Sequence, residues 1–240
     1  MINKKDGKIR IYDRDNNCLA SLDVTRGIAV TELVLPSERG LSVLFSVCDT
    51  AGVSDATMED WQKQEMPQRK RGKHMDRTHI AAGEMLFCAM EYLGYGREQV
   101  KKNYVGEAGS RPCFSNLPVD FSISHSHSLV VLALLKREDD PTDQGSKARI
   151  GVDIETKISK RKTDPIRMAE RFFTLHEQKI IAASAVSQME FMRIWTLKEA
   201  WMKREQIPLS EAFQVDVLDK SVHKSICYIA GEDMTGVILA

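Results

Sequence analysis

The sequence predicts an α+β fold built as two successive halves. Segments typical of short strands fill the first 65 residues and return at the C-terminus, whereas three well-marked helices lie together between residue 164 and about residue 204. A polar segment with Pro and Gly, residues 136–148, separates the two groups. Mixed strands and helices in separate runs favour an α+β class. We therefore place the halves at residues 1–145 and 146–240.

The first half reads as strands followed by a helix. KIRIYD, IAVTELVL and LSVLFSV alternate apolar and polar residues or run β-branched, which favours strands. Asp76 is suited to cap a helix that presents an apolar face and ends at Gly94 and Gly96. Residues 121–135 then predict a strand, a tight turn near His125–His127 and a second, buried strand.

The second half begins with a buried strand, RIGVDIE, that has acidic residues at its end. Asp164-Pro165 predicts a helix start, because Pro fits the first helical position. Possible capping boxes at Thr174–Glu177 and Ser187–Glu190 predict the starts of two further helices, the last of which runs to about Arg204. FQVDV, SICYIA and GVILA predict closing strands.

The composition is that of a soluble globular protein. The 240 residues contain 34 Lys+Arg and 34 Asp+Glu, and this zero net charge argues against bulk binding to nucleic acid or membranes. The chain has no apolar run of about 18 residues, and its charged start has no signal-peptide core. Five scattered cysteines without a CxxC pair fit reduced thiols. We therefore expect a cytoplasmic protein with no nucleic-acid or membrane partner.

Two acidic residues on the predicted strand GVDIE are the first candidate metal ligands. Alternation along a strand places Asp153 and Glu155 on one face, while Val152 and Ile154 enter the core. Neighbouring like charges are unfavourable unless they are neutralised, and ligands that are all oxygen favour Mg²⁺. The alternative is a pair of solvated acids at an exposed strand edge.

The helix WTLKEAWMK carries a second candidate group. Glu199 and Lys203 lie one turn apart on one face, with Lys198 adjacent, and the alternative is an ordinary surface ion pair. Glu177 has two possible roles, because its place in the capping box explains it without catalysis. One residue can fill both roles.

Histidines and a basic run are candidates for anion binding. His125 and His127 form an HxH pair that can bind zinc, but no cysteine or third histidine lies near in sequence, which favours a structural or anion-binding histidine. Five Lys/Arg fall within residues 69–77, as either a solvated face or a phosphate site. These five are Arg69, Lys70, Arg71, Lys73 and Arg77.

In this order and spacing, three segments resemble the phosphopantetheinyl transferases of the surfactin-synthetase-activating type. The segments are GVDIE, RFFTLHE and WTLKEAWMK, against the family pattern G-[VI]-D-[VIL]-E, F-[ST]-x-x-E and W-x-x-K-E-[AS]. FSISHS, residues 121–126, is similar to the upstream F-N-I-S-H-S of that family. The resemblance extends over about residues 66–217 and is faint before them.

The resemblance implies two similar α+β halves related by a pseudo-twofold axis, with the active site in the cleft between them. It also implies an Mg²⁺-dependent enzyme that moves the 4′-phosphopantetheine arm of coenzyme A to a serine of an apo acyl or peptidyl carrier protein. Adenosine 3′,5′-bisphosphate is the other product of that reaction. A monomer is expected, since one chain supplies both halves of the site.

The resemblance also assigns roles to residues of this chain. Asp153, Glu155 and Glu199 would hold Mg²⁺ on the coenzyme A pyrophosphate, where the metal neutralises developing charge. Glu177 would be the general base and Lys203 would assist the leaving group. Lys198 would be a catalytic neighbour, and the expected contacts to coenzyme A come from Ser124, His125, Arg111, Arg77 and the basic run Arg69, Lys70, Arg71 and Lys73.

Some positions depart from the family pattern. His127 stands where the family has Gly, and a histidine tolerates positive φ less well than glycine does. Ser122 replaces a commoner Asn, and the segment 204–209 replaces a Gly-Lys-Gly-Leu loop. None of these departures touches the three carboxylates.

Two other functions compete with the transferase. Pro118-Val-Asp120 and Glu155-Thr-Lys157 form a loose PD…ExK pattern of metal-dependent nucleases, in which acids hold Mg²⁺ and the lysine assists. That pattern leaves WTLKEA unexplained. The other competitor is an inactive module that only binds coenzyme A or a carrier protein.

Overall fold

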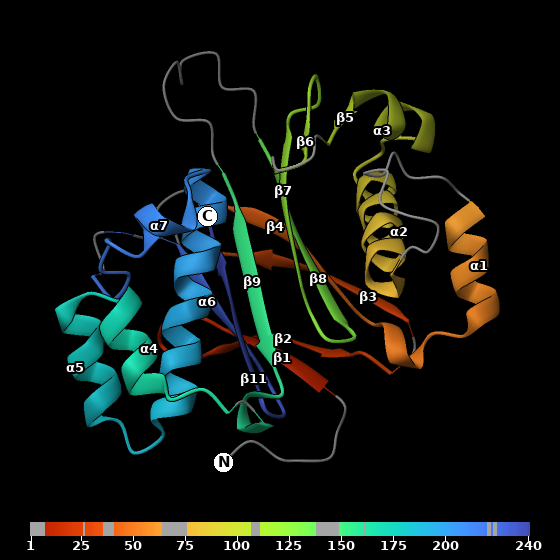
Figure 1. The fold of residues 1–240 in the computed structure, drawn as a ribbon. Coiled ribbons are helices and arrows are strands. Elements are labelled where there is room, and N and C mark those ends of the chain that lie inside the picture. The colour runs from red at the N-terminus through yellow and green to blue at the C-terminus, as the bar shows by residue number, and fades with distance from the viewer. Residues whose placement is uncertain are drawn as a thin grey trace.

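Two antiparallel sheets and two groups of helices make up the fold (Figure 1). This computed structural model describes residues 8–25, 27–35, 41–63, 76–106, 111–137, 149–160, 162–219, 222 and 225–240. The predicted α+β class is confirmed. The pseudo-twofold relation between halves remains a prediction.

The first sheet gathers strands from both ends of the chain. Its order is β2 (Cys18–Asp23), β1 (Lys8–Tyr12), β10 (Ile226–Gly231), β11 (Met234–Leu239) and β9 (Gly151–Thr156). The second sheet has the order β3 (Ile28–Val34), β4 (Ser42–Asp49), β8 (Leu129–Lys136) and β7 (Val119–Ser126). A two-stranded pair is formed by β5 (Tyr104–Val105) and β6 (Cys113–Phe114).

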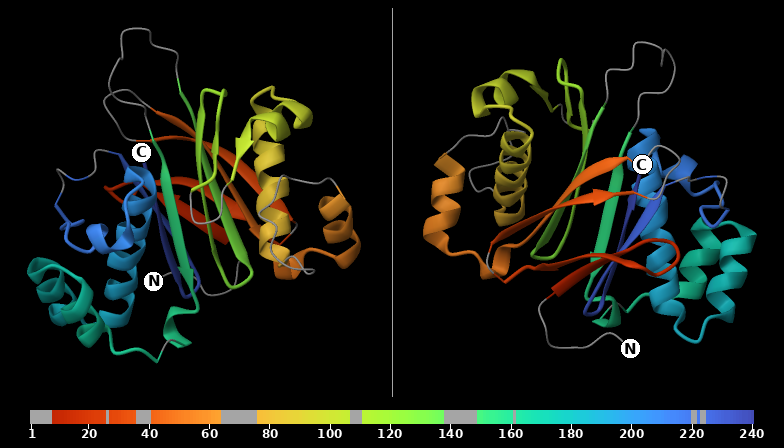
Figure 2. Two further views of the ribbon diagram at one scale, coloured as in Figure 1. Left: turned by 45° about the horizontal axis from the view of Figure 1, so that its top comes forward. Right: turned by 180° about the vertical axis from the view of Figure 1, so that it is seen from behind.

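The helices form two groups on opposite sides of the paired sheets (Figure 2). One group precedes β7 and consists of η1 (Thr50–Gly52), α1 (Asp55–Lys63), α2 (Arg77–Tyr92) and α3 (Arg97–Asn103). The other follows β9 and consists of η2 (Ile158–Lys160), α4 (Pro165–Phe172), α5 (Leu175–Ala183), α6 (Ser187–Glu205) and α7 (Leu209–Ala212). Among the described helices none is both long and apolar enough to cross a membrane.

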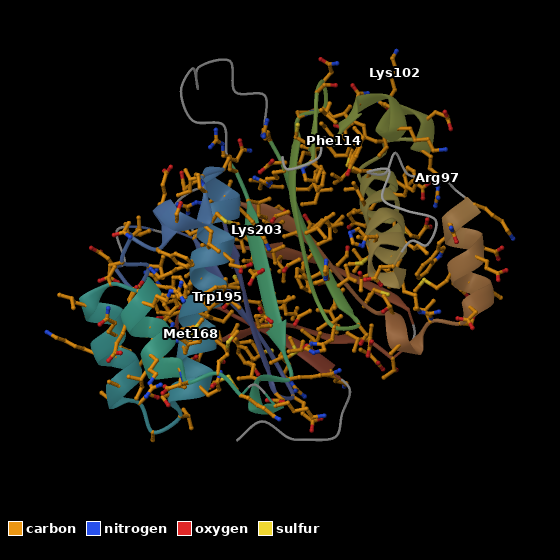
Figure 3. The ribbon with its side chains drawn as sticks, in the orientation of Figure 1. Arg97, Lys102, Phe114, Met168, Trp195 and Lys203 are labelled. Carbon is orange, nitrogen blue, oxygen red and sulfur yellow. The ribbon has the colours of Figure 1, made fainter. Side chains whose placement is uncertain are left out.

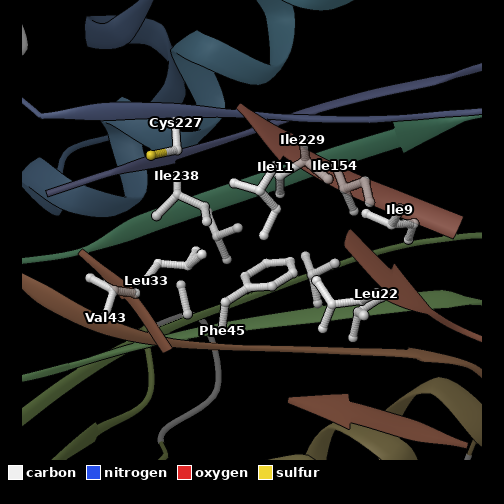
Figure 4. Close-up of a cluster of buried hydrophobic side chains, with 14 of the residues drawn as sticks. Ile9, Ile11, Leu22, Leu33, Val43, Phe45, Ile154, Cys227, Ile229 and Ile238 are labelled. Carbon is white, nitrogen blue, oxygen red and sulfur yellow. The ribbon is translucent and has the colours of Figure 1, made fainter. Parts of the chain in front are cut away.

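The main core lies between the inner faces of the two sheets (Figure 4). Phe45 of β4 is fully buried there against apolar residues that include Ile11 of β1, Ile154 of β9 and Ile238 of β11. Burial of each such side chain contributes about 1.5–3 kcal/mol of transfer free energy. The sheets are therefore joined by a shared core, and β9 is held on its inner face.

The proposed division at residue 145 remains a proposal. Strands β3 to β8 precede that residue and β9 to β11 follow it, but β1 pairs with β10, for example through Ile11 and Ile229. The first hairpin of the chain therefore lies in the sheet of the second half. Residues 138–148, most of the expected boundary, lie outside the described residues.

Local signals predicted most helix starts. Asp76 caps α2, Asp164 caps α4 ahead of Pro165, and Thr174–Glu177 forms a complete capping box on α5. The prediction of a capping box at Ser187–Glu190 is wrong. Helix α6 does begin at Ser187, but no side chain among the described residues caps it. The Glu190 carboxylate instead pairs with Arg193 at 2.6 Å.

Two other expectations on the elements need correction. FQVDV, residues 213–217, forms turns after α7 instead of a strand, because its backbone bonds to buried charged side chains described below. Helix α1 lies within the first 65 residues, where only strands and turns were expected. The hydroxyl of Ser54 accepts a bond from the Thr57 N–H at 3.2 Å at its start, a local cap that apolar periodicity does not reveal.

Gly151 fixes how closely α6 packs on β9. A Cβ atom at this position would lie 1.9 Å from the carbonyl oxygen of Ala200 and 3.0 Å from the backbone nitrogen of Arg204. Only glycine allows this approach of strand and helix backbone. The glycine that opens GVDIE therefore brings the acidic face of β9 up against α6.

Candidate active site

A row of hydroxyls on β7 completes the free edge of β9. Strand β9 ends its sheet, so alternate backbone N–H groups on its outer side have no neighbouring strand. The N–H of Val152 donates to Oγ of Ser122 at 3.0 Å, and the N–H of Thr156 donates to Oγ of Ser126 at 3.1 Å. We call this contact between β7 and β9 the β7–β9 seam. It explains why serines alternate in FSISHS.

Asp153 is held at the middle of the β7–β9 seam. The residue is 2% exposed, and its Oδ1 accepts bonds from Oγ of Ser124 at 2.6 Å and from Nζ of Lys203 at 2.7 Å. Its Oδ2 is also buried and has no hydrogen-bond partner among the described residues. Further along β9, Glu155 accepts a bond from Oγ of Ser126 at 3.0 Å. The hydroxyl and ammonium donors around Asp153 therefore all meet Oδ1.

Glu199 of α6 belongs to the same cluster. Its pKa is raised to about 7, chiefly by burial and next by the charge of Asp153. Lys203 opposes the shift, whereas Glu155 and a side-chain hydrogen bond with Asp153 add to it. The structure therefore brings Glu199 to Asp153 and Glu155, which precede it by 46 and 44 residues in the chain.

The donor set of this cluster fits a hard divalent cation. Three carboxylates repel one another, one of their buried oxygens has no donor, and oxygen ligands suit Mg²⁺. No group of three potential ligand side chains within the described ranges is already arranged as a metal cage. The chemistry of the residues, and not a preformed cage, supports the metal.

Lys203 lies between α6 and β9, as Figure 3 shows. Besides Asp153, its ammonium donates to the carbonyl oxygen of Val152 at 3.1 Å. The ammonium therefore compensates part of the negative charge of the cluster. It also provides a cation beside the carboxylates for any phosphate that binds there.

His125 of β7 packs against a second histidine on α2, within electrostatic range of this cluster. The ring centroids of His79 and His125 are 5.6 Å apart. The pKa of His125 is lowered by burial, by His79 and by Lys203, whereas Asp76 and Asp153 oppose the shift. His79 was missed in the sequence, where a lone histidine carries no motif. Its position one turn after the helix cap Asp76 was the available signal.

Glu177 and Lys198 form a separate, fully buried ion pair. Nζ of Lys198 lies 2.8 Å from Oε2 of Glu177, and both side chains are 0% exposed. Glu177 also accepts bonds from the N–H groups of Thr174 and Val217, both at 2.9 Å. Lys198 donates to the carbonyl oxygen of Val215 at 2.6 Å. The capping role of Glu177 is confirmed, and its burial gives no support to a role as base.

Two arginines expected at coenzyme A are engaged within the fold. Arg77 pairs with Asp55 of α1 and donates to the carbonyl oxygen of Thr50 at 3.0 Å. Arg111 donates to the carbonyl oxygen of Lys203 at 2.8 Å and pairs with a buried carboxylate. The remaining residues of the expected basic site lie outside the described residues, namely Arg69, Lys70, Arg71 and Lys73.

His127 occupies the turn between β7 and β8 in the left-handed conformation. Its φ is 56°, as expected for the position where the family has glycine. Its Nδ1 lies 3.0 Å from Oγ1 of Thr156, on the first sheet. His125 instead faces His79, so the two histidines of the HxH pair do not share one site.

The structure separates the acids of the nuclease pattern. Asp120 accepts a bond from the N–H of Ile150 at 2.8 Å, at the start of β9, whereas Glu155 bonds to Ser126 at the other end of the β7–β9 seam. Five residues of strand correspond to about 17 Å. Because these acids cannot hold one metal, the nuclease alternative is not supported.

Fold and site together define an α+β protein. Carboxylates of β9, in the first sheet, and of α6 lie beside β7, the strand of the second sheet that carries serines and a histidine. Residues 149–233, from β9 to the turn after β10, match the model of the 4′-phosphopantetheinyl transferase superfamily. A search of curated proteins finds no match to the chain. The chain thus contains a domain of this superfamily, and that domain includes all three predicted metal carboxylates.

Proposed function

We propose that the chain transfers the 4′-phosphopantetheine arm of coenzyme A to a serine of an apo acyl or peptidyl carrier protein. The match of residues 149–233 to the transferase superfamily carries this proposal. The cluster of Asp153, Glu155 and Glu199 beside Lys203 and His125 supports it, because it combines oxygen ligands with phosphate-binding groups.

In this proposal, the three carboxylates would hold Mg²⁺ at the site that binds coenzyme A. When bound, the metal neutralises charge that develops on the phosphate oxygens. Lys203 places its ammonium beside the same phosphates and stabilises the leaving group. Ser124 and His125 contact the phosphates from β7, and His79 joins them from α2 because its ring faces His125.

The reaction is a displacement at phosphorus. The carrier serine oxygen forms a bond to the phosphorus of the phosphopantetheine arm, and the bond from that phosphorus to the bridging pyrophosphate oxygen breaks. Adenosine 3′,5′-bisphosphate leaves with the electron pair, and the serine proton passes to solvent at the site. We leave Glu177 out of this step, because its carboxylate is buried in the ion pair with Lys198.

Carrier-dependent release of adenosine 3′,5′-bisphosphate tests this proposal. The chain is incubated with coenzyme A and Mg²⁺, with or without a set of apo acyl and peptidyl carriers, and the nucleotide is quantified by chromatography. Release that requires a carrier supports the transferase. Release without a carrier indicates coenzyme A hydrolysis, and no release with any carrier favours the inactive binding module; either result refutes the proposal.

A further inference from the structure

Arg111 bonds to α6, to β7 and to the residue before β9, and so contacts three of the segments around the candidate site. Its NH1 donates to the carbonyl oxygen of Lys203 on α6 at 2.8 Å. Its NH2 donates to the carbonyl oxygen of Ile150, at the start of β9, at 2.8 Å and to Oδ2 of Asp120 on β7 at 3.0 Å. The same NH2 also contacts the carbonyl oxygen of Phe121. One planar guanidinium thus joins β7, β9 and α6.

The contact to Lys203 caps the last turn of α6. Helix α6 ends at Glu205, so the carbonyl of Lys203 is one of those without a partner inside the helix. Arg111 supplies that partner, and Arg149 does the same for Glu205 by donating to its carbonyl oxygen at 3.0 Å. Cations at this end also interact favourably with the helix dipole.

The acidic partner of Arg111 is Asp120, a buried carboxylate with several further partners. The residue is 3% exposed, and its Oδ2 accepts from the N–H of Ile150 at 2.8 Å as well as from Arg111. Its Oδ1 lies 3.5 Å from the guanidinium of Arg137. Removal of one partner from such a buried pair leaves an uncompensated charge, which strongly destabilises a fold.

These contacts leave Arg111 little capacity for a phosphate. Its side chain is 16% exposed, and the two N–H groups of NH2 already serve three acceptors. These bonds thus use NH2 fully and one N–H of NH1, and they hold the guanidinium between β7, the residue before β9 and α6. The bonds within the fold therefore favour a structural role for the arginine before Pro112.

We propose that Arg111 is a positioning residue, which ties α6 to β7 and β9 and so sets Lys203 against Asp153, and that it does not contact coenzyme A. The effect on turnover rests on the proposed transferase function. The structural link between Arg111 and Asp120 does not, so the two can fail separately.

A double-mutant cycle measures the link in the full chain without any substrate. The variants are Arg111→Met, Asp120→Asn and their combination, with Arg167→Met as control because its side chain is 85% exposed on α4. Each single variant is expected to lower the urea midpoint clearly, and the double variant by much less than the sum. Additive shifts would overturn the link. If Arg111→Met does not fold, Arg111→Lys replaces it in the cycle.

Hydrogen exchange shows whether the link positions the site. Peptides that cover β9 and the end of α6 are expected to exchange faster in Arg111→Met than in the wild type or Arg167→Met. Unchanged exchange in both segments would refute the positioning role. This readout is informative even if the wild-type chain transfers nothing.

Kinetics separate positioning from phosphate binding. For Arg111→Lys we expect kcat to fall about tenfold or more while KM for coenzyme A changes less than about twofold, because displaced catalytic groups lower the rate and leave ground-state binding largely intact. A raised KM for coenzyme A with unchanged kcat and an unchanged urea midpoint would show that Arg111 is a phosphate ligand. An inactive wild type would refute the proposed function, and the unfolding and exchange measurements would still decide the role of Arg111.

Discussion

The ammonium group of Lys203 lies 2.7 Å from Oδ1 of Asp153 and joins α6 to β9 at the candidate metal site. Ser124 of β7 bonds to the same oxygen, whereas Oδ2 of Asp153 has no hydrogen-bond partner in the described part of the chain. One side of the carboxylate is thus fixed by the protein and the other is left for a cation. The predictions below follow from this division and from the packing that maintains it.

Neutral replacements in the carboxylate cluster should separate activity from stability. Asp153→Asn and Glu199→Gln are expected to lower Mg²⁺-dependent transfer at least about a hundredfold, because charge stabilisation is lost where the reaction needs it. In EDTA Glu199→Gln should melt no lower than the wild type, since like-charge repulsion is relieved, whereas Asp153→Asn also loses the charge that Lys203 pairs with. Glu190→Gln, which changes a half-buried carboxylate paired with Arg193 on the same helix, is the control. Near-normal turnover in either variant would rule out the metal assignment.

Glu199 should make the metal-free protein less stable as pH rises. Its pKa in the folded chain is about 7 against an ordinary value of 4.5, so between these values the folded state binds more protons than the unfolded state. Stability is greatest below pH 4.5 for this group and is lost as pH rises to 7, by at most about 3 kcal/mol.

Urea unfolding in EDTA, at several values from pH 4.5 to pH 8, measures this contribution as the difference between wild type and Glu199→Gln. Mg²⁺ should restore stability above pH 7, because it binds the ionised carboxylate. A difference that does not change with pH would contradict the shifted pKa of Glu199.

The buried Glu177–Lys198 pair should contribute to stability as a unit. Lys198→Met leaves a buried carboxylate without its cation, and we expect a loss of about 3–5 kcal/mol of unfolding free energy. Adding Glu177→Gln should recover part of that loss. Arg193→Met breaks a more exposed pair on the same helix and should change stability by no more than about 1 kcal/mol. Denaturant titrations of both single variants and the double variant decide this, and a double-variant loss equal to the sum of the two single losses would argue against a coupled pair.

Gly151→Ala should disturb the approach of α6 to β9. The added methyl group would lie 1.9 Å from the carbonyl oxygen of Ala200, so helix and strand must move apart. We expect the free energy of unfolding to fall by about 1–3 kcal/mol. Gly96→Ala is the matched control, because no atom lies within 4 Å of a Cβ there. Urea midpoints compare the two variants. A neutral Gly151→Ala would mean that this close packing does not set the helix position.

Sequence reasoning found the parts of the site that depend on local pattern. The alternation of Asp153 and Glu155 with core residues follows from strand geometry, and the capping box at Thr174–Glu177 follows from helix termini. It did not find that β1 pairs with β10, since pairing across more than 200 residues leaves no local signal. Long-range hydrogen bonds were not predicted for Arg77 and Arg111 either. Their charges suggested phosphate binding, but each donates to a backbone carbonyl far away in the sequence.

The mass of an apo carrier protein, measured after incubation with the chain, coenzyme A and Mg²⁺, tests the central claim most directly. The account predicts a gain of one phosphopantetheinyl group that disappears in EDTA and in the Glu199→Gln variant, but persists in Glu190→Gln. No gain with any of several acyl and peptidyl carriers, or a gain that survives EDTA, would contradict it.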